Sequence, residues 1–530
     1  MATKFTEEQL NKFDKETLIS LFLSQQEQLA SIDQKLQLLL EQVTVLNQKR
    51  FGRSSEKLEI EHQITFTEID KEFAFFNEAE AVSALDEEEE EVSTSKQKKQ
   101  KGKREADLKY LPTVIIEHKM TEDQLQMEFG DKSWKQLPDE VYRRYQFTPA
   151  KIEIEEHHVA VYAEKTGDHM VKAKHPTYLL RNSLVSPSLE AAIINSKYIN
   201  AVPFYRQEKE FDRYGLPITR QNMANWTIQC ADRYLGILYD YLHEQLYDYH
   251  VLQADETPVV VNKDGRTAGS KSYMWVYRSG AMSSHHPIVL YDYQKTRNTN
   301  HPREFLKNFK GICVTDGYAV YHSLAKERED LTIAGCWAHS RRRYDEAVKA
   351  LPKEERKKSL AYLALKQIQA IYREENRLKE FTPEERLEHR KLSVKPLVDA
   401  YFAWVRAHID KVLPKSKTWN GMNYSTNQEN YLKTFLCDGE VPMDNNAAEQ
   451  SIRGFCIGKK NWMFIDTIHG AKSSAIIYSI AETAKANNLK PYEYFKYLLA
   501  EIPEHMEDKD RSFCEKLLPW SPDLPDVCRK

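Results

Sequence analysis

An acidic residue stands in the middle of an apolar, β-branched stretch of this sequence. Asp255 lies within Val251–Val261, and a buried strand tolerates an ionised carboxylate only where a partner or a metal receives it. Asp255 is therefore either a hydrogen-bonded structural acid or the first ligand of a metal site. Asp316 and Glu449 could complete such a site. Three carboxylates offer the hard oxygen ligands that Mg²⁺ prefers, and two ions could activate an attacking oxygen and stabilise a leaving one in phosphodiester cleavage.

The order of the elements around these acids predicts that they meet. From residue 249 we expect three successive strands, a helix, a fourth strand, a helix and a fifth strand. The strands are expected at Val251–Val261, Tyr273–Arg278, Pro287–Tyr293, Gly311–Thr315 and Thr332–Cys336. This is the order of the ribonuclease-H-like fold, a comparison made by analogy. In that fold the first and fourth strands are neighbours, so Asp255 in mid-strand and Asp316 at a strand end converge. Glu449, on the helix after the fifth strand, supplies a third oxygen donor.

Other charged residues near the three acids have different expected roles. Glu256 follows Asp255 on the strand and should face the opposite side. Asp444 or Asn445 is expected to cap the short helix that carries Glu449. Arg453 comes one turn after Glu449 on the same helix face, where it could hold a DNA phosphate or orient the carboxylate.

Upstream of the strands the pattern is helical and has the outline of a helix-turn-helix. A helix is expected over Phe204–Tyr214, followed by a turn with Gly215 and by Thr219 as the N-cap of a second helix. The second helix begins with residue types that read base edges or hold phosphates. They are Arg220, Gln221 and Asn222. The same outline also fits a helix pair that binds no DNA.

Residues 16–48 carry a heptad repeat of apolar residues. Its two seams are Phe22, Leu29, Leu36 and Val43, and Leu18, Gln25, Ile32, Leu39 and Leu46. The repeat favours a parallel coiled-coil dimer, with a lone amphipathic helix as the alternative. Arg50 and Arg53 follow directly, and these cations could bind DNA phosphates or simply cap the helix end.

Charge is distributed unevenly along the chain. The net charge is -4 overall, but residues 68–91 alone hold eleven acids and one base, so the remainder carries +6. The acidic run and the lysines after it predict a disordered linker, either a plain spacer or a shield for a DNA site. A mildly basic remainder is weak support for a nucleic-acid partner.

The whole chain reads as a multidomain α+β / α/β protein. The expected segments are a coiled-coil dimerisation helix (1–52), a basic then acidic disordered linker (53–105), a small β-rich module (106–180), a helix-turn-helix region (181–248), the first part of the core (249–344), a helical insertion (345–440), the second part of the core with the helix of Glu449 (441–490), and a C-terminal helix and tail (491–530). In the second part of the core, Lys459 and Lys460 lie in a basic loop that could contact DNA.

Composition excludes several classes of protein. The seven cysteines are scattered and form no C-x-x-C pair, which is typical of reduced thiols and of neither a disulfide framework nor a zinc knuckle. The N-terminus lacks the apolar core of a signal peptide, and no apolar run is long enough to span a membrane. We expect a cytoplasmic, nucleoid-associated bacterial protein without a membrane partner.

Several motifs together resemble those of the insertion-sequence sixty-six transposases. They are Gln253–Pro258, Thr315–Tyr318, Cys336–Arg342, Asp444–Arg453, Arg50–Glu56 after the heptad repeat, and Ala481–Asn487. The resemblance implies a DDE transposase whose catalytic, metal-binding triad is Asp255, Asp316 and Glu449. It implies Mg²⁺, or Mn²⁺ in its place, as cofactor. It also implies hydrolysis at the element ends, followed by attack of the freed 3′-OH on target DNA.

In one respect the chain departs from that family. Members commonly carry a cysteine-rich zinc-binding segment after the linker, whereas residues 106–180 contain no cysteine. We therefore assign no zinc. The expected partners are the terminal repeats of the element, target DNA, a second copy of the chain and accessory proteins of the same element. The alternatives are a catalytically inactive DNA-binding or scaffold relative and a ribonuclease-H-like nuclease.

Overall fold

The computed structural model describes residues 15, 19, 23, 26, 121–129, 152–163, 170–173, 178–267, 269–283 and 285–530. The predicted coiled coil, apart from four positions, and the charged linker with Arg50 and Arg53 lie outside the described residues. The chain divides into two compact units, one of residues 81–172 and the other of residues 1–80 and 173–530. No helix among the described residues is long and apolar enough to cross a membrane.

The smaller unit contains one described helix and a pair of short strands. Helix α5 spans Glu122–Phe129, and strands β1 (Val161–Ala163) and β2 (Met170–Lys172) pair antiparallel. The sequence pattern predicts a strand from residue 151, but residues 152–160 have no regular secondary structure. Their alternation does not bury an apolar face, since Ile154 is 94% exposed. Alternation without a surface to cover does not fix a strand.

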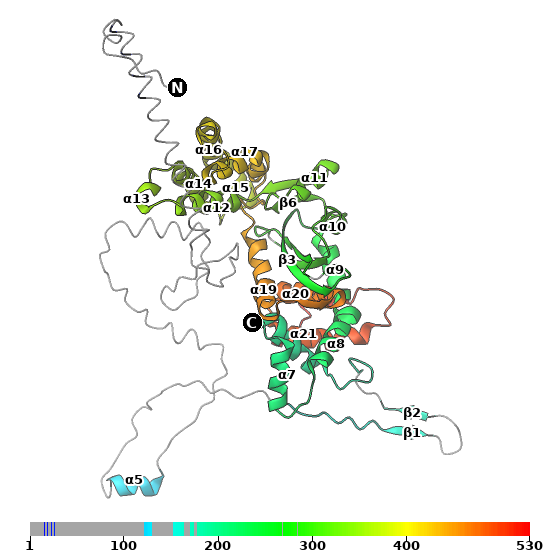
Figure 1. The fold of residues 1–530 in the computed structure, drawn as a ribbon. Coiled ribbons are helices and arrows are strands. Elements are labelled where there is room, and N and C mark those ends of the chain that lie inside the picture. Colours follow the sequence, from blue (N-terminus) through cyan, green and yellow to red (C-terminus); the bar gives the residue numbers. More distant parts are fainter. Residues whose placement is uncertain are drawn as a thin grey trace. The chain divides into compact units, whose positions relative to one another are not determined.

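A mixed sheet forms the centre of the larger unit (Figure 1). Its strands are β3 (Val251–Lys263), β4 (Lys271–Ser279), β5 (Val289–Gln294), β6 (Gly311–Thr315) and β7 (Leu331–Gly335), in the order β5-β4-β3-β6-β7. The first three pair antiparallel, whereas β6 lies parallel to β3 and β7 parallel to β6. The expected adjacency of the first and fourth strands is confirmed. A short strand, β8 (Ile465–Thr467), runs parallel to the far end of β3.

A helix covers one edge strand of the sheet. Helix α20 (Ile468–Ala486) packs on the edge strand β5, where Ser479 Oγ accepts a hydrogen bond from Tyr291 N at 2.7 Å. Thr483 Oγ1 both accepts from Val289 N and donates to Val289 O, each at 3.0 Å. These hydroxyls occupy backbone groups that an edge strand would otherwise leave open.

The helix pair predicted before the sheet is present. Helix α7 spans Phe204–Arg213 and α8 spans Arg220–Cys230, and the Thr219 hydroxyl caps α8 by accepting from Asn222 N at 3.2 Å. A small apolar cluster of Ile193, Ile218 and Met223 packs beneath the pair. Helix α9 (Gly236–Leu246) then leads into β3.

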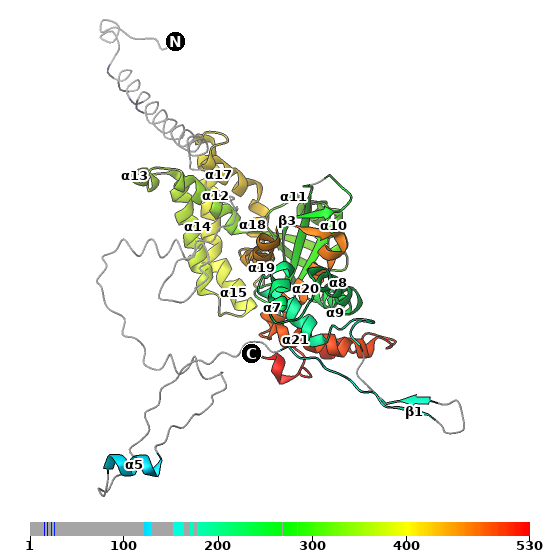
Figure 2. The same cartoon turned by 60° about the horizontal axis from the view of Figure 1, so that its bottom comes forward.

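The long segment after β7 consists of helices joined by turns, and its described residues contain no strand. Helix α12 (Trp337–Lys349) follows β7 directly, and the longer insertion helices are α14 (Leu360–Arg377), α16 (Lys395–His408) and α17 (Lys417–Asn427). They pack around Trp337, Tyr344 and Tyr401 in a second apolar cluster. Figure 2 shows this helical group beside the sheet, with α19 (Asn446–Trp462) between the two. The helix that carries Glu449 was expected to be short, but it is 17 residues long. Its apolar face lies along the sheet, which stabilises its full length.

Candidate active site

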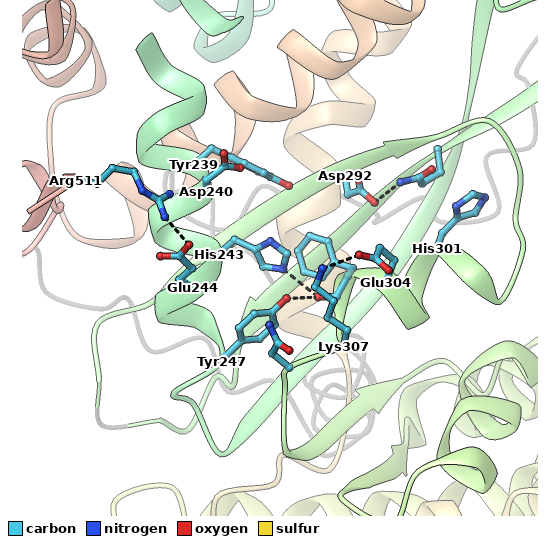
Figure 3. Close-up of a pocket in the computed structure, with 13 residues that line it drawn as sticks. Tyr239, Asp240, His243, Glu244, Tyr247, Asp292, His301, Glu304, Lys307 and Arg511 are labelled. Carbon is cyan, nitrogen blue, oxygen red and sulfur yellow. Dashed lines mark hydrogen bonds and ion pairs between the residues drawn. The ribbon is translucent and has the colours of Figure 1, made fainter. Parts of the chain in front are cut away.

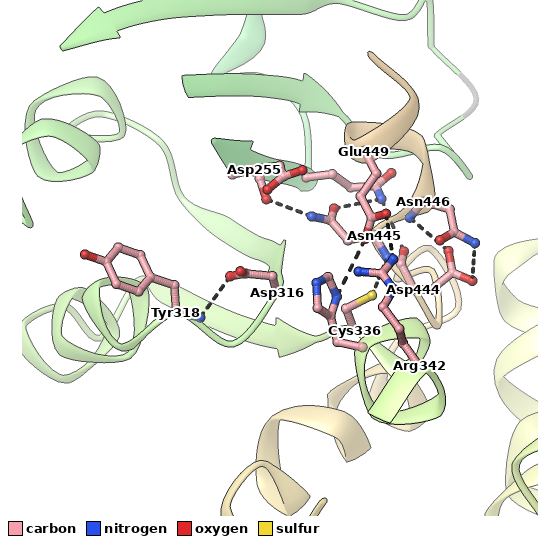
Figure 4. Close-up of polar contacts among 12 residues, drawn as sticks. Asp255, Asp316, Tyr318, Cys336, Arg342, Asp444, Asn445, Asn446 and Glu449 are labelled. Atoms are coloured by element: carbon pink, nitrogen blue, oxygen red, sulfur yellow. Dashed lines mark hydrogen bonds and ion pairs between the residues drawn. The ribbon is translucent and has the colours of Figure 1, made fainter. Parts of the chain in front are cut away.

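The pairing of β3 with β6 places two of the three predicted acids together. Gln253 is the Cα partner of Val314 in this parallel ladder. Asp255 and Asp316 each lie two residues further on, and residues two apart on a strand share a face. Figure 4 shows Asp255 on β3, Asp316 directly after the end of β6, and Glu449 close to Asp255.

Asp255 is half-buried on β3 and surrounded by negative charge. Its Oδ1 accepts one hydrogen bond, from Glu256 N at 2.8 Å. Burial raises the pKa of Asp255 well above its usual range, and the charges of Glu256, Glu449 and Asp316 raise it further. No cation appears among these influences. Asp255 therefore lacks the compensating partner that a structural buried acid requires.

Asp316 is held by a turn that only glycine can complete. Tyr318 N donates to Asp316 Oδ1 at 2.9 Å, and Gly317 has a φ of +88°. A Cβ at Gly317 would lie 3.0 Å from the Tyr424 hydroxyl. That hydroxyl, on insertion helix α17, donates to Asp316 O at 2.9 Å. The insertion thus braces the turn that carries the second acid, a role that the sequence did not indicate for Tyr424.

Glu449 is fixed through the start of helix α19. Asn445 Nδ2 donates to Ala254 O at 2.8 Å, and Gln253 Nε2 donates to Asn445 Oδ1 at 3.2 Å. These bonds dock the first turn of α19 onto β3 beside Asp255. Glu449 follows one turn later and is 8% exposed. The third acid therefore reaches the sheet through two amides, at a point far along the chain from both aspartates.

Helix α12 supplies the groups that contact Glu449. Arg342 Nη2 donates to Glu449 Oε2 at 3.2 Å, and His339 Nδ1 lies 3.6 Å from Glu449 Oε1. Cys336, at the start of the same helix, accepts a hydrogen bond on Sγ from Asn445 N at 3.1 Å. The Cys336–Arg342 motif marked this segment in the sequence, but only the structure reveals that it orients Glu449.

The donor atoms of the site suit a hard divalent cation. Glu449 Oε1 is buried and accepts no hydrogen bond from the described residues. Cys336 Sγ, a His339 nitrogen and a Glu449 oxygen lie within 4.8 Å of one another, but burial first, and then Glu449 and Asp444, raise the pKa of the Cys336 thiol well above its usual range. Sulfur is a soft donor, whereas Mg²⁺ and Mn²⁺ favour carboxylate and other hard oxygen ligands. The carboxylates of Asp255, Asp316 and Glu449 therefore form the set that could hold Mg²⁺ or Mn²⁺.

Glu256 lies on the other face of β3 and has a cation of its own. Arg297 Nε donates to Glu256 Oε1 at 2.7 Å, and the guanidinium stacks on the Tyr318 ring at 3.6 Å from its centroid. Burial is the largest influence on the pKa of Glu256, followed by the charge of Asp316, and Arg297 opposes both; the result is a pKa of about 7. Adjacent acids on one strand thus have opposite surroundings.

The other predicted site residues lie on elements around the carboxylates. Of the two expected cap residues, Asn445 stands at the N-cap of α19 but its side chain makes no capping hydrogen bond, and Asp444 Oδ1 accepts from Asn446 N at 3.1 Å. Arg453 is half-buried one turn after Glu449, and Lys459 Nζ donates to Pro258 O at 2.7 Å from the last turn of α19. Arg220, Gln221 and Asn222 are exposed in the first turn of α8. The structure therefore brings together the three acids, and it spreads the predicted DNA contacts over α8 and α19.

A cavity of about 620 Å³ lies elsewhere, between α9, the end of β5 and helix α10 (Asn300–Phe305) (Figure 3). It too is lined by acids, but these have partners. Arg511 Nη2 donates to Glu244 at 2.8 Å, Lys307 Nζ to Glu304 at 2.7 Å, and Gln294 Nε2 to Asp292 at 2.8 Å. The cavity is therefore a weaker candidate for a metal-dependent reaction than the three carboxylates.

Comparisons with known proteins give a consistent family match. Residues 182–473 match the family model described as "Transposase IS66 family", residues 479–520 match "IS66 C-terminal element", and residues 38–116 match "Transposase C of IS166 homeodomain". Two similar chains are the uncharacterized proteins y4qI and y4jD of Sinorhizobium fredii. The first is 29% identical over 372 residues, covering 68% of this chain and 67% of the relative. The second is 26% identical over 366 residues, covering 66% and 69%.

Proposed function

Because this chain belongs to the IS66 family of transposases, we propose that it is a DDE transposase. It cuts DNA at the ends of an insertion sequence by metal-dependent hydrolysis and joins the freed 3′-OH to target DNA. The family match supports a transposase function that acts on DNA. The chemistry and its residues are the part that we propose.

The convergence of three carboxylates carries the proposal. Asp255 and Asp316 come from neighbouring strands, and Glu449 comes from a helix docked onto the strand of Asp255. The charges of Asp316 and Glu449 both raise the pKa of Asp255. The strand order, with three antiparallel strands followed by two parallel ones, supports a ribonuclease-H-like core. Asp255 has no cation of the kind that Glu256 has in Arg297, which argues against a purely structural role for Asp255.

Each residue of the proposed site has a distinct task. Asp255, on a central strand, and Asp316, in a braced turn, hold their carboxylates rigidly. Arg342 fixes the direction of the Glu449 carboxylate. Two Mg²⁺ ions, or Mn²⁺, bound by the three acids would supply an activated water or 3′-OH and charge for the leaving oxygen.

The basic residues outside the triad are proposed to hold the DNA. Arg453 and the last-turn pair Lys459 and Lys460 extend along α19 from the carboxylates, so phosphates of one duplex could contact both. Arg220, Gln221 and Asn222 on α8 are exposed for base edges or phosphates of the terminal repeat. Arg50 and Arg53, beside a coiled coil that joins two copies of the chain, complete the proposed set of contacts.

Nicking of a duplex that carries the inverted repeats bracketing the gene tests the proposal. With Mg²⁺, Asp255→Asn should nick at least about a thousandfold more slowly than wild type, because metal-assisted stabilisation contributes several kcal/mol. Glu256→Gln is the matched control, with a change of the same size at the next residue, and should nick at nearly the wild-type rate.

Each alternative predicts a different result. A scaffold relative would show no Mg²⁺-dependent nicking in the wild type. A nuclease of the same fold would cut branched junctions without preference for the repeats. Full activity of Asp255→Asn would remove that residue from the site.

A further inference from the structure

The end of helix α19 presents an unusual apolar tip. Met463 is 67% exposed and Phe464 is 51% exposed, directly after the last turn of the helix. Large apolar side chains side by side on a surface indicate a binding partner more often than isolated ones do. We call these two residues the α19 tip.

The backbone of the tip is strained in a way that exposes its side chains. Met463 has φ 66° and ψ -47°, and Phe464 N donates to Trp462 O at 2.7 Å across it. This is a γ-turn with positive φ, which is rare and strained in proteins. Glycine would relieve that strain because it lacks a Cβ. A methionine in this turn therefore points to a use for its side chain.

The charge around the tip suits a polyanion. From Gln450 to Ile465 the chain has three cations and no acid. Two of these cations, Lys459 and Lys460, stand in the last turn of α19. The next acid, Asp466, is paired with Lys263 at 2.7 Å.

The tip also lies between the two regions that the proposed function assigns to DNA. Glu449 is 14 residues earlier on α19, which corresponds to about 21 Å of helix. At the other end, Asn461 Nδ2 donates to Ala201 O at 2.8 Å, and the Lys197 ammonium lies 3.7 Å from the centre of the Phe204 ring. Phe204 is the first residue of α7. A duplex that reaches from the helix pair to the carboxylates would pass the tip.

We propose that Met463 and Phe464 form a wedge that inserts against unstacked bases of duplex DNA. The lysines in the last turn of α19 hold the DNA backbone beside the tip, and the apolar pair replaces the stacking that a base loses when a step opens. Apolar side chains between base steps are a known means of kinking DNA. The inference rests on the proposed function, because that function brings a duplex to α19.

The wedge can be tested with full-length protein and two duplexes of one arbitrary sequence, fully paired or with a single mismatched step next to 2-aminopurine. The wild type should bind the mismatched duplex about fivefold or more tightly, since stacking on a protein side chain favours an open base by that order. Binding should also change the 2-aminopurine fluorescence. Fluorescence anisotropy measures the two affinities.

Two variants remove the wedge in different ways. Met463→Gly and Phe464→Ala should lose the preference for the mismatched duplex while keeping the affinity for the paired one. Met463→Gly also relieves the positive φ, so its melting temperature should not fall below that of the wild type. Leu392→Ala, at an insertion residue that is 76% exposed, is the control for loss of an exposed apolar side chain and should behave as wild type.

Three results would overturn the wedge. They are a wild type without preference, a preference that persists in both variants, and variants that change only the oligomeric state in light scattering, which would assign the tip to a second copy of the chain. A wild-type protein that prefers the mismatched duplex but does not nick DNA would instead count against the proposed function. A wild-type protein that nicks DNA but does not prefer the mismatched duplex would count against the wedge alone.

Discussion

Buried acids in two regions of the molecule are treated in opposite ways. In the insertion, Glu375 accepts hydrogen bonds from Arg390 Nε at 3.1 Å on both oxygens, and Arg390 also donates to Phe435 O at 2.7 Å and to Asp438 O at 2.6 Å. Arg390 is fully buried, so this pair is complete without solvent. On the sheet, Asp255 is surrounded by other acids.

The difference distinguishes an acid with an architectural role from one that we propose to bind a metal. Glu375 and Arg390 join helix α14 to the segment that returns the chain toward α19, so their pairing holds the insertion in shape. The acids of the sheet gain nothing from one another, because like charges at close range raise the free energy of the folded state. In our proposal, a bound divalent cation relieves this destabilisation.

Breaking the architectural pair should have the largest effect on stability. Arg390→Met leaves the buried Glu375 carboxylate without its cation, and we expect the free energy of unfolding to fall by about 3–5 kcal/mol. Urea denaturation followed by circular dichroism measures the change. The double variant Glu375→Gln/Arg390→Met should recover much of the loss, since no unpaired charge remains. A loss below about 1 kcal/mol in Arg390→Met would contradict the assignment.

Removing the paired acid of β3 should have a smaller effect. Glu256→Gln loses hydrogen bonds with Arg297, which is partly exposed, but it also removes a carboxyl whose pKa burial raises to about 7, so we expect a loss of no more than about 1 kcal/mol in unfolding free energy. Thermal unfolding at neutral pH measures it. Nicking should be nearly unchanged. A variant that keeps its stability and loses nicking would reverse the roles of Glu256 and Asp255.

A third kind of buried acid should show an effect that depends on pH. Glu190 is fully buried, accepts from the Thr227 hydroxyl at 2.8 Å, and has its pKa raised by burial to about 8. The unfolded chain releases this proton near pH 4.5, so the wild type loses stability as pH rises from about 4.5 to 8. Glu190→Gln has no such proton. Its advantage over wild type should grow from pH 5 to pH 8, by at least about 1 kcal/mol.

Calorimetric melting of both proteins at the two pH values checks this prediction. Thr227→Val is a companion variant, because it removes the hydroxyl that donates to Glu190 and keeps the Glu190 carboxyl. An equal difference between Glu190→Gln and wild type at both pH values would show that Glu190 does not titrate with folding.

Much of the sheet was predictable because local pattern and burial agree there. The five strands appear close to their expected positions, since β-branched runs such as Val259–Val261 favour a pleated, buried backbone. The meeting of Asp255 and Asp316 followed from topology, because the fourth strand runs parallel to the first and ends beside Asp255. Thr219 was also identifiable, because an N-cap residue acts on a neighbour three positions away.

Contacts over long sequence separations could not be predicted. Tyr424 braces Asp316 from 108 residues away, and Arg342 reaches Glu449 across 107 residues. The local sequence pattern around Tyr424 or Arg342 does not indicate its partner. The fold of the insertion determines which distant residue each one contacts. The strained turn at Met463 was likewise hidden, since methionine is not a residue that signals positive φ.

Thermal stabilisation by Mg²⁺ tests the central distinction most directly. If Asp255, Asp316 and Glu449 bind the cation, the melting temperature of the wild type should rise with Mg²⁺, by an amount that corresponds to about 2.7 kcal/mol at a hundredfold excess over Kd. Glu256→Gln should show the same rise, and Asp255→Asn should show little of it. An equal rise in Asp255→Asn and wild type would contradict the account, because Asp255 would then not belong to the metal site.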